Sequence, residues 1–351
     1  MDVPLEPDLS DPVFGLGPAA EALSGLGVRW SLGVEDRQQP AARVLALLLA
    51  GNLQQFRSFE FSVLNDLDPE QLHDFRVSLR RARSLLSSGR SVFPSAQRKE
   101  LLAQLAEFGR LTSRVRDLDV LLEDLPKLYR AVGLGVVVGG GVEDGKQSSE
   151  SQELRAAVLR NRSGAFADLA ARIDPEGGEA AKYQAMLRLW YVLGSVHRLG
   201  GDDPGKDALR PSVVVAKATI LMQFGKVRSA GRAAKKSNEV SDWHRLRKRA
   251  KALRYGLVAY APLLNEPAVS DLVSRLRKLQ NVLGRQQDHA VQIQLIELAG
   301  VQAGGRTALL AGAISEQLRL EALKDLQSCS AAWSRFDQSS FKGDLAAAVT
   351  L

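Results

Sequence analysis

The sequence predicts an all-α fold, and three observations support that prediction. Apolar residues recur at helical spacing along most of the 351-residue chain, and the alternation typical of strands is nearly absent. A helical unit in the first part of the chain also recurs 171 residues later. The composition, 45% hydrophobic and 25% charged, is typical of a globular protein with one large or two ordinary domains.

The first predicted helix begins at Pro40, because proline suits the first turn of a helix. Val44, Leu45 and Leu48 then follow at helical spacing. The residues before it, 1–37, are rich in Pro, Gly and Asp and show no sustained period. We therefore expect them to form a poorly ordered N-terminal arm.

The next two helices have recognisable starts. Asp68 followed by Pro69 is typical of an N-cap and a first helical position, and this helix is predicted to run to about Gly89. Ser95 is a candidate cap for a third helix, which is predicted to continue toward Leu125.

Glycine then interrupts the pattern. Residues 133–150 are a glycine-rich connector, and helical spacing resumes over 152–173 and 179–199. Further helices are predicted from residue 211 almost to the end of the chain. The connector nearly fits a phosphate-binding loop, but Gln147 replaces the Ser or Thr that would reach magnesium. We interpret it as a flexible linker.

The internal repeat is the most informative feature. The run His73-Asp74-Phe75-Arg76 recurs as His244-Arg245-Leu246-Arg247, 171 residues later. The same offset carries Pro40 onto Pro211, Arg57 onto Arg228, Arg80 onto Lys251, Arg83 onto Arg254, Arg114 onto Arg285 and Asp117 onto Asp288. Duplication of a helical unit predicts an approximate two-fold arrangement, with the two halves packed face to face.

Each repeated helix has a row of cations beside an apolar face when it is drawn at about 100° per residue. The cationic rows are His73, Arg76, Arg80 and Arg83 in the first helix, and His244, Arg247, Lys251 and Arg254 in the second. The apolar faces are Phe75, Leu79, Ala82 and Leu86, and Leu246, Ala250, Leu253 and Leu257. Like charges at these spacings repel, so each row requires counter-charge. Internal carboxylates such as Asp117, Asp119 and Asp288 are one source, and an external polyanion is the other.

The charge distribution favours the polyanion. The net charge is +7, and residues 226–254 hold eleven basic residues against two acidic ones. Such a field attracts polyanions, and arginine suits phosphate because its planar fork donates two parallel hydrogen bonds. Proteins that bind single-stranded nucleic acid interleave aromatic residues with cations, whereas only 6% of this chain is aromatic. The residue types therefore favour a ligand of bare phosphates over nucleic acid.

Four segments carry these features: LHDFRVSLRRARSLL, RDLDVLLEDL, WHRLRKRAKALRYGL and LRKLQNVLGRQQD. Together they resemble the CHAD family, the conserved histidine α-helical domain, over residues 38–336. The resemblance implies two four-helix bundles related by pseudo-two-fold symmetry, a basic channel, and binding of inorganic polyphosphate. It also implies association with polyphosphate granules.

The resemblance implies a domain division and a set of site residues. The division is an N-terminal arm (1–37), a first helical repeat (38–199), a second (211–336) and a C-terminal tail (337–351). The implied polyphosphate-binding residues are His73, Arg76, Arg80, Arg83, His244, Arg247, Lys251 and Arg254, extended to Arg57, Arg228, Arg114 and Arg285. Family members are often fused or neighboured to a triphosphate-tunnel domain. The arm is too short for one, so we expect any catalytic partner, such as a polyphosphate-metabolising enzyme, to be a separate protein.

We expect a non-enzymatic module with no cofactor and no metal. His73 and His244 lie on separate helices without a second His or Cys at ligand spacing. His73-Asp74 also resembles the metal-binding pair of phosphohydrolases, but the second repeat has Arg245 where Asp74 stands. Three alternatives remain open: a metal-dependent phosphohydrolase, a nucleic-acid-binding scaffold and a scaffold for acidic proteins.

A cytoplasmic, granule-associated protein is expected. The single cysteine, Cys329, rules out an intramolecular disulfide and is predicted simply to pack in the interior. The longest apolar run, 44–50, is far shorter than a membrane span, and the acidic, proline-broken start is unlike a signal peptide.

Overall fold

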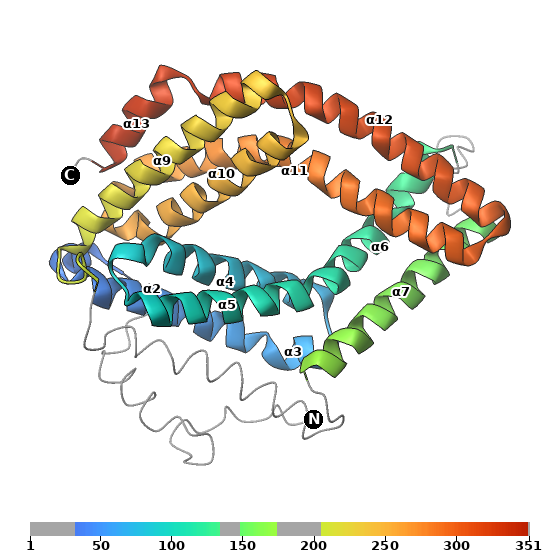
Figure 1. The fold of residues 1–351 in the computed structure, drawn as a ribbon, viewed down its shortest axis with the longest axis horizontal. Helices are drawn as coiled ribbons and strands as arrows, with labels where there is room; N and C mark the ends of the chain where they lie inside the picture. The colour runs from blue at the N-terminus through green and yellow to red at the C-terminus, as the bar shows by residue number, and fades with distance from the viewer. Residues whose placement is uncertain (1–31, 134–147, 174–204, 350–351) are drawn as a thin grey trace, which may run out of the picture.

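The described part of the chain is helical throughout. The structure, a computed structural model, describes residues 32–133, 148–173 and 205–349 (Figure 1). Within these ranges the only β-type pairing is an isolated bridge between Pro40 and Pro211, so the all-α prediction is confirmed. The connector's phosphate-loop-like segment, the helix predicted over 179–199 and most of the N-terminal arm lie outside these residues.

The elements, in chain order, are η2 (Val34–Gln38), α2 (Ala41–Ser58), α3 (Glu60–Leu64), α4 (Pro69–Ser88), η3 (Gly89–Ser91), α5 (Ser95–Leu111), α6 (Ser113–Ala131), α7 (Ser149–Ile173), α9 (Ser212–Ser237), α10 (Val240–Tyr260), η5 (Ala261–Leu263), α11 (Glu266–Ala303), α12 (Gly305–Phe336) and α13 (Ser339–Val349). Helices α9, α10 and α11 begin 171 residues after α2, α4 and α5.

The same offset relates two backbone hydrogen bonds that join the halves. The N–H of Ala41 donates to the carbonyl of Arg210 at 2.9 Å. The N–H of Ser212 donates to the carbonyl of Gln39, also at 2.9 Å. The 171-residue offset carries Ala41 onto Ser212 and Gln39 onto Arg210, so the two hydrogen bonds are equivalent. The starts of α2 and α9 therefore lie opposite one another.

The helix predicted from Ser95 toward Leu125 is in fact two helices. It is broken at Thr112, between α5 and α6, and Ser95 is the first residue of α5 rather than its cap. Arg76 of α4 donates to the carbonyl of Gly109 at 2.8 Å and to the hydroxyl of Thr112 at 2.8 Å. The guanidinium thus binds acceptors at the break. The corresponding stretch of the second half, α11, is one continuous helix of 38 residues.

Two apolar clusters hold the helices together. The larger joins α2, α4, α9, α10, the first part of α11 and the end of α12, and the fully buried Trp243 and Tyr260 lie within it. The smaller joins α6, α7, the second part of α11 and the start of α12 around Leu118 and Ile296. Because α11 runs through both, it couples them into one structure. No helix in the described ranges has the length and apolar content needed to cross a bilayer.

The last residues of the chain pack into the larger cluster. The segment that the sequence analysis sets apart as a tail contains α13, whose Phe341, Leu345 and Ala348 are buried. Phe341 stacks on Phe224 of α9 with ring centroids 5.4 Å apart. This segment is therefore part of the folded domain.

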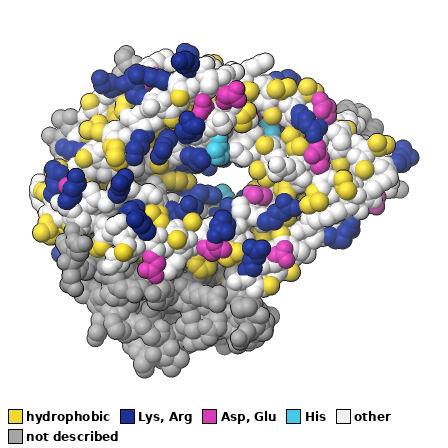
Figure 2. All heavy atoms as spheres, viewed as in Figure 1, with side chains coloured by type: hydrophobic (Ala, Val, Ile, Leu, Met, Phe, Trp, Pro, Cys, Tyr) yellow, Lys and Arg dark blue, Asp and Glu magenta, His cyan; other side chains and the backbone are white. Residues whose placement is uncertain are grey.

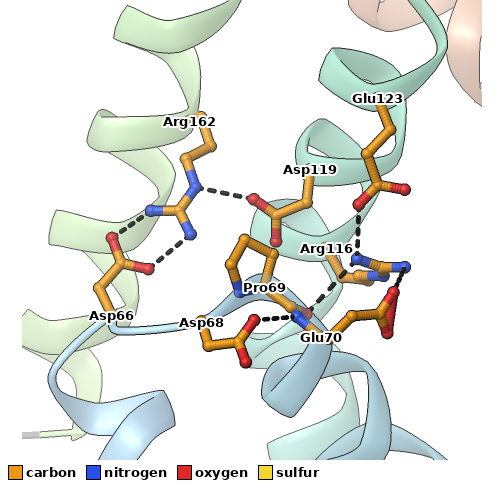
Figure 3. A network of polar contacts seen from close by, with 8 residues as sticks. All are labelled: Asp66, Asp68, Pro69, Glu70, Arg116, Asp119, Glu123 and Arg162. Atoms are coloured by element: carbon orange, nitrogen blue, oxygen red, sulfur yellow. Dashed lines mark hydrogen bonds and ion pairs between the residues drawn. The ribbon is translucent and has the colours of Figure 1, made fainter.

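A network of ion pairs ties α7 to α6 and to the segment between α3 and α4 (Figure 3). Arg162 of α7 donates to Asp119 of α6 at 2.8 Å and also pairs with Asp66, which lies between α3 and α4. Arg116 of α6 pairs beside it with Glu123 at 3.3 Å. Asp119 is therefore a buried carboxylate whose charge is paired with Arg162, and it is not available to neutralise the cationic rows.

Candidate functional site

Helices α4 and α10 carry the two predicted rows of cations. The carboxylate of Asp68 accepts from the backbone N–H of Glu70 at 2.9 Å, and Pro69 follows it at the first helical position, so the predicted start of α4 is confirmed. The predicted apolar faces, Phe75, Leu79, Ala82 and Leu86 in α4 and Leu246, Ala250, Leu253 and Leu257 in α10, are buried. Burial of these faces fixes how each helix is rotated and turns the adjacent cations toward the space between the halves.

The two rows approach each other where α4 packs against α10. Arg80 of α4 lies near enough to α10 to lower the pKa of both Lys251 and Arg254 by charge repulsion. Around this contact, Lys and Arg side chains gather at an opening near the centre of the molecule, and His side chains lie at its rim (Figure 2).

A cleft of about 380 Å³ lies along this contact. Its cationic lining residues are Arg80 and Arg83 from α4, Lys226 from α9, and Lys248, Arg249 and Lys251 from α10. Among the described residues that line it there is no Asp or Glu. The cleft therefore holds six cations without a matching carboxylate in its wall, an arrangement that favours an anionic ligand.

The pKa values show how closely the cations crowd. Burial, together with Arg247 and Arg80, lowers the pKa of Lys251 to about 8. Burial lowers the pKa of Arg76 to about 10, and Asp117 offsets part of that effect. The pKa values of His73 and His244 are also lowered, chiefly by burial, so both imidazoles are mainly neutral at pH 7.

Three buried nitrogens in these rows have no hydrogen-bond partner in the described part of the chain. They are the Nε of Arg80, the Nε of Arg247 and the Nδ1 of His244. A buried polar nitrogen without a partner is costly, so each of the three favours a hydrogen-bond partner supplied from outside the chain.

Three arginines of the rows have partners within the chain. Arg247 pairs with Asp288 at 3.4 Å, and Arg254 donates to the side-chain oxygen of Gln280 at 2.8 Å while its guanidinium stacks on Tyr255. Arg76 is held at the α5–α6 break. These contacts orient the three guanidiniums beside the cleft, and Arg247 is the one that forms an ion pair with a carboxylate of the described residues.

The four arginines of the predicted site that lie outside the two rows differ in their partners and exposure. Arg228 pairs with Asp337 at 2.9 Å and Arg285 with Asp325 at 2.9 Å, so internal carboxylates neutralise both. Arg114 is exposed on α6. Arg57 belongs to α2, and its side chain lies outside the described residues.

Asp117 and Asp288 occupy equivalent positions on α6 and α11. Burial raises the pKa of both carboxyls, and neighbouring arginines, Arg76 and Arg247 respectively, counter that rise. Asp117 also accepts from the hydroxyl of Ser113 at 3.3 Å. Each carboxylate thus offsets the charge of one arginine at the edge of the rows, and Asp288 also raises the pKa of Lys251 in the cleft. The wall of the cleft itself contains no carboxylate among the described residues.

Three cationic lining residues are absent from the predicted set: Lys226, Lys248 and Arg249. All three are among the eleven basic residues counted over 226–254. Lys248 and Arg249 lie on α10 outside its predicted cationic row, and Lys226 lies on α9. The packing of α9 beside α10 brings Lys226 to the same cleft.

Residues of the competing motifs can be located in the described part of the structure. The described residues contain no group of three or more His, Cys, Asp or Glu side chains suited to a metal ion. Asp74 of the phosphohydrolase-like pair is exposed. Cys329 is buried, as the packing interpretation predicts, and burial raises the pKa of its thiol to about 11.

Comparison with known proteins identifies the family. The model of the CHAD domain matches residues 47–297, which is well over half of the chain. The chain belongs to the CHAD domain family. The CHAD resemblance of the four sequence segments is thereby confirmed.

Two relatives of this CHAD protein come from Mycobacterium tuberculosis: Uncharacterized protein MT2285 (strain CDC 1551 / Oshkosh) and Uncharacterized protein Rv2226 (strain ATCC 25618 / H37Rv). Each is 26% identical over 264 residues, which are 72% of this chain and 45% of the relative. The CHAD chain therefore spans less than half the length of these proteins.

Two solved structures share the fold of this CHAD chain. The crystal structure of the CHAD domain from the plant Ricinus communis has a TM-score of 0.64 at 22% identity, and the match covers 86% of this chain and 94% of that one. PptA from Streptomyces chartreusis has a TM-score of 0.60 at 18% identity, over 84% and 99%. At these identities the likeness concerns the helical fold alone.

Proposed function

We propose that this CHAD chain binds inorganic polyphosphate along the cleft between α4 and α10, and that it catalyses no reaction there. The observation that carries the proposal is a cleft wall with six cations and no carboxylate among the described residues. Membership of the CHAD family supports the choice of polyphosphate.

The proposal accounts for the energetic cost of the cleft. Six cations at close range repel one another, and a linear polyanion between the helices replaces that repulsion with charge-assisted hydrogen bonds. The Nε groups of Arg80 and Arg247 are buried donors without partners, and phosphate oxygens would satisfy them. Binding would be multivalent, with release of counterions adding to the affinity and salt weakening it.

Nucleic acid fits the cleft less well. Bases need aromatic surfaces for stacking, and Tyr255 is the one aromatic residue among the described lining residues. Its ring already faces the guanidinium of Arg254, with the guanidinium carbon 4.7 Å from the ring centroid. Bare phosphates require no such surface.

The symmetry of the chain extends the proposal. The equal offsets of the helix starts, and the equivalent bonds at Ala41 and Ser212, support two copies of one unit arranged as pseudo-symmetric bundles. The rows on α4 and α10 would then grip one anionic chain from both sides. A protein that binds polyphosphate in this way would act in the cytoplasm. It would gather at polyphosphate granules and meet polyphosphate-metabolising enzymes there.

A competition titration tests the proposal. Long-chain polyphosphate should displace a labelled single-stranded oligonucleotide of equal total charge, and the oligonucleotide should not displace polyphosphate. The same samples, with and without divalent metal, should release no phosphate. Preference for the oligonucleotide would favour a nucleic-acid scaffold, and metal-dependent phosphate release would favour the phosphohydrolase.

Binding should also weaken as the pH rises above about 8. Lys251, whose pKa is about 8, must be protonated to contact phosphate, so affinity should fall by at most about tenfold per pH unit between pH 8 and 10. Titrations at constant ionic strength measure this fall. K251R, which keeps its charge throughout this range, should lose much less; an equally steep fall in K251R would contradict the assignment.

The free protein should respond to pH in the opposite direction. The pKa of Lys251 lies below the ordinary lysine value of 10.5, so the unfolded chain binds more protons between these two values. The contribution of Lys251 to the free energy of unfolding therefore rises with pH across this window. Denaturation curves without polyphosphate at pH 8 and 10, for the natural protein and for K251R, measure that contribution.

A further inference from the structure

A second pocket adjoins the cleft at the far end of α4. Its volume is about 770 Å³, and it lies among the end of α4, η3, the start of α5, the first turns of α9 and the loop that precedes α9. Its charged lining residues are Arg90, Lys206, Asp207, Arg210 and Lys226. None of these residues except Lys226 lines the cleft between α4 and α10.

The two hollows share a wall. Ser87, Ser88, Met222 and Lys226 line both, so the space beside Arg80 and Lys251 continues past the end of α4 toward Arg90 and Lys206. Lys226 stands at the junction, where one anionic chain could contact it from either side.

The loop with Lys206 is fixed in place by the backbone. The N–H of Gly205 donates to the carbonyl of Val92 at 3.1 Å, and the N–H of Asp207 donates to the carbonyl of Ser91 at 2.8 Å. Because these bonds flank Lys206 on both sides, its position beside η3 and Arg90 is preorganised before any ligand arrives.

The single carboxylate of this pocket is already matched. Asp207 pairs with Arg210 at 3.1 Å, and hydrogen bonds from the side chains of Ser91 and Arg210 hold its pKa below the ordinary value. Arg90 and Lys206 have no ion pair in the described part of the chain. The first turn of α5, which borders the pocket, contains no acidic residue, so the helix end adds a weak attraction for anions.

We propose that the pocket at Arg90 and Lys206 is a second phosphate-binding site that holds the continuation of a polyphosphate chain lying in the α4–α10 cleft. The inference rests on the proposed function and makes it more specific: the preferred ligand is a long chain that occupies both hollows. A short chain in the cleft leaves the second pocket empty and gains nothing from its cations.

Chain length is therefore the variable that tests the inference. The variant R90Q/K206Q removes the two unmatched cations and leaves Lys226 and the cleft intact. Its affinity for polyphosphate of about one hundred phosphates should fall about tenfold or more, since charge-assisted contacts are lost. Its affinity for tripolyphosphate should stay within about twofold of the natural protein.

A charge-matched control separates contact from general attraction. K127Q/K324Q removes two exposed lysines, on α6 and α12, that line neither hollow. Its affinity for both chain lengths should change by less than about twofold at physiological salt. An equal loss in the control, or an equal loss for both lengths in R90Q/K206Q, would overturn the second site. Failure of the natural protein to bind either length would instead overturn the proposed function itself.

Discussion

Replacing Arg80, Arg83 and Lys251 together with glutamine should abolish tight polyphosphate binding without harming the fold. The three side chains lie in the cleft and lack a carboxylate partner in the described residues. Loss of three charge-assisted contacts, each worth about 1 to 2 kcal/mol, predicts at least a hundredfold lower affinity. The slope of the logarithm of affinity against the logarithm of salt concentration should also decrease by about two.

The stability of this variant should change in the opposite direction. Removing three like charges from the cleft relieves repulsion, so the melting temperature without ligand should be equal or higher. Fluorescence titration and thermal melting on the same samples measure both effects. A control that removes Lys127, Arg130 and Lys324, which are exposed and line neither hollow, should bind nearly as the natural protein does. Affinity retained within about threefold in the cleft variant would place the binding site elsewhere.

Replacing Arg162 with methionine should destabilise the protein strongly. The side chain of Arg162 is 13% exposed and its partner Asp119 is 2% exposed, so the variant leaves a carboxylate buried without its counter-ion (Figure 3). Breaking a buried pair on one side costs about 3 to 5 kcal/mol. Urea denaturation should therefore show a lower free energy of unfolding by about that amount.

Two further variants identify the cause. Arg160 lies two residues away on α7 and is exposed, so R160M should change the free energy of unfolding by less than about 0.5 kcal/mol. The double variant R162M/D119N removes the stranded charge and should regain part of the lost stability. If R162M and R160M were equally stable, the network would be a surface feature with little energetic weight.

The sequence predicts the helices of the site well, because the information is local. Asp68 and Pro69 mark the start of α4, and the apolar faces of α4 and α10 follow from spacing alone. The break at Thr112 does not follow from spacing along one helix, and the acceptors at the break are bound by Arg76, which reaches Gly109 and Thr112 from another helix.

Which carboxylate pairs with which arginine also depends on contacts between residues far apart in the sequence. Arg228 and Arg285 belong to the repeated pattern as clearly as Arg80 does, yet Asp337 and Asp325 neutralise them across the fold. Lys226 is only one member of a basic run in the sequence, and the packing of α9 against α10 makes it part of two hollows. Spacing along one helix cannot show which charges meet another helix.

The helical class, the 171-residue repeat and the faces on which the cations lie follow from residue order, because helix periodicity and duplication are local patterns in the sequence. Which cations remain unmatched depends on how the helices pack. Burial of the apolar faces brings Arg80 against Lys251, while distant carboxylates reach other arginines. Charge neutralisation depends on distance in space, and only the packed helices set those distances.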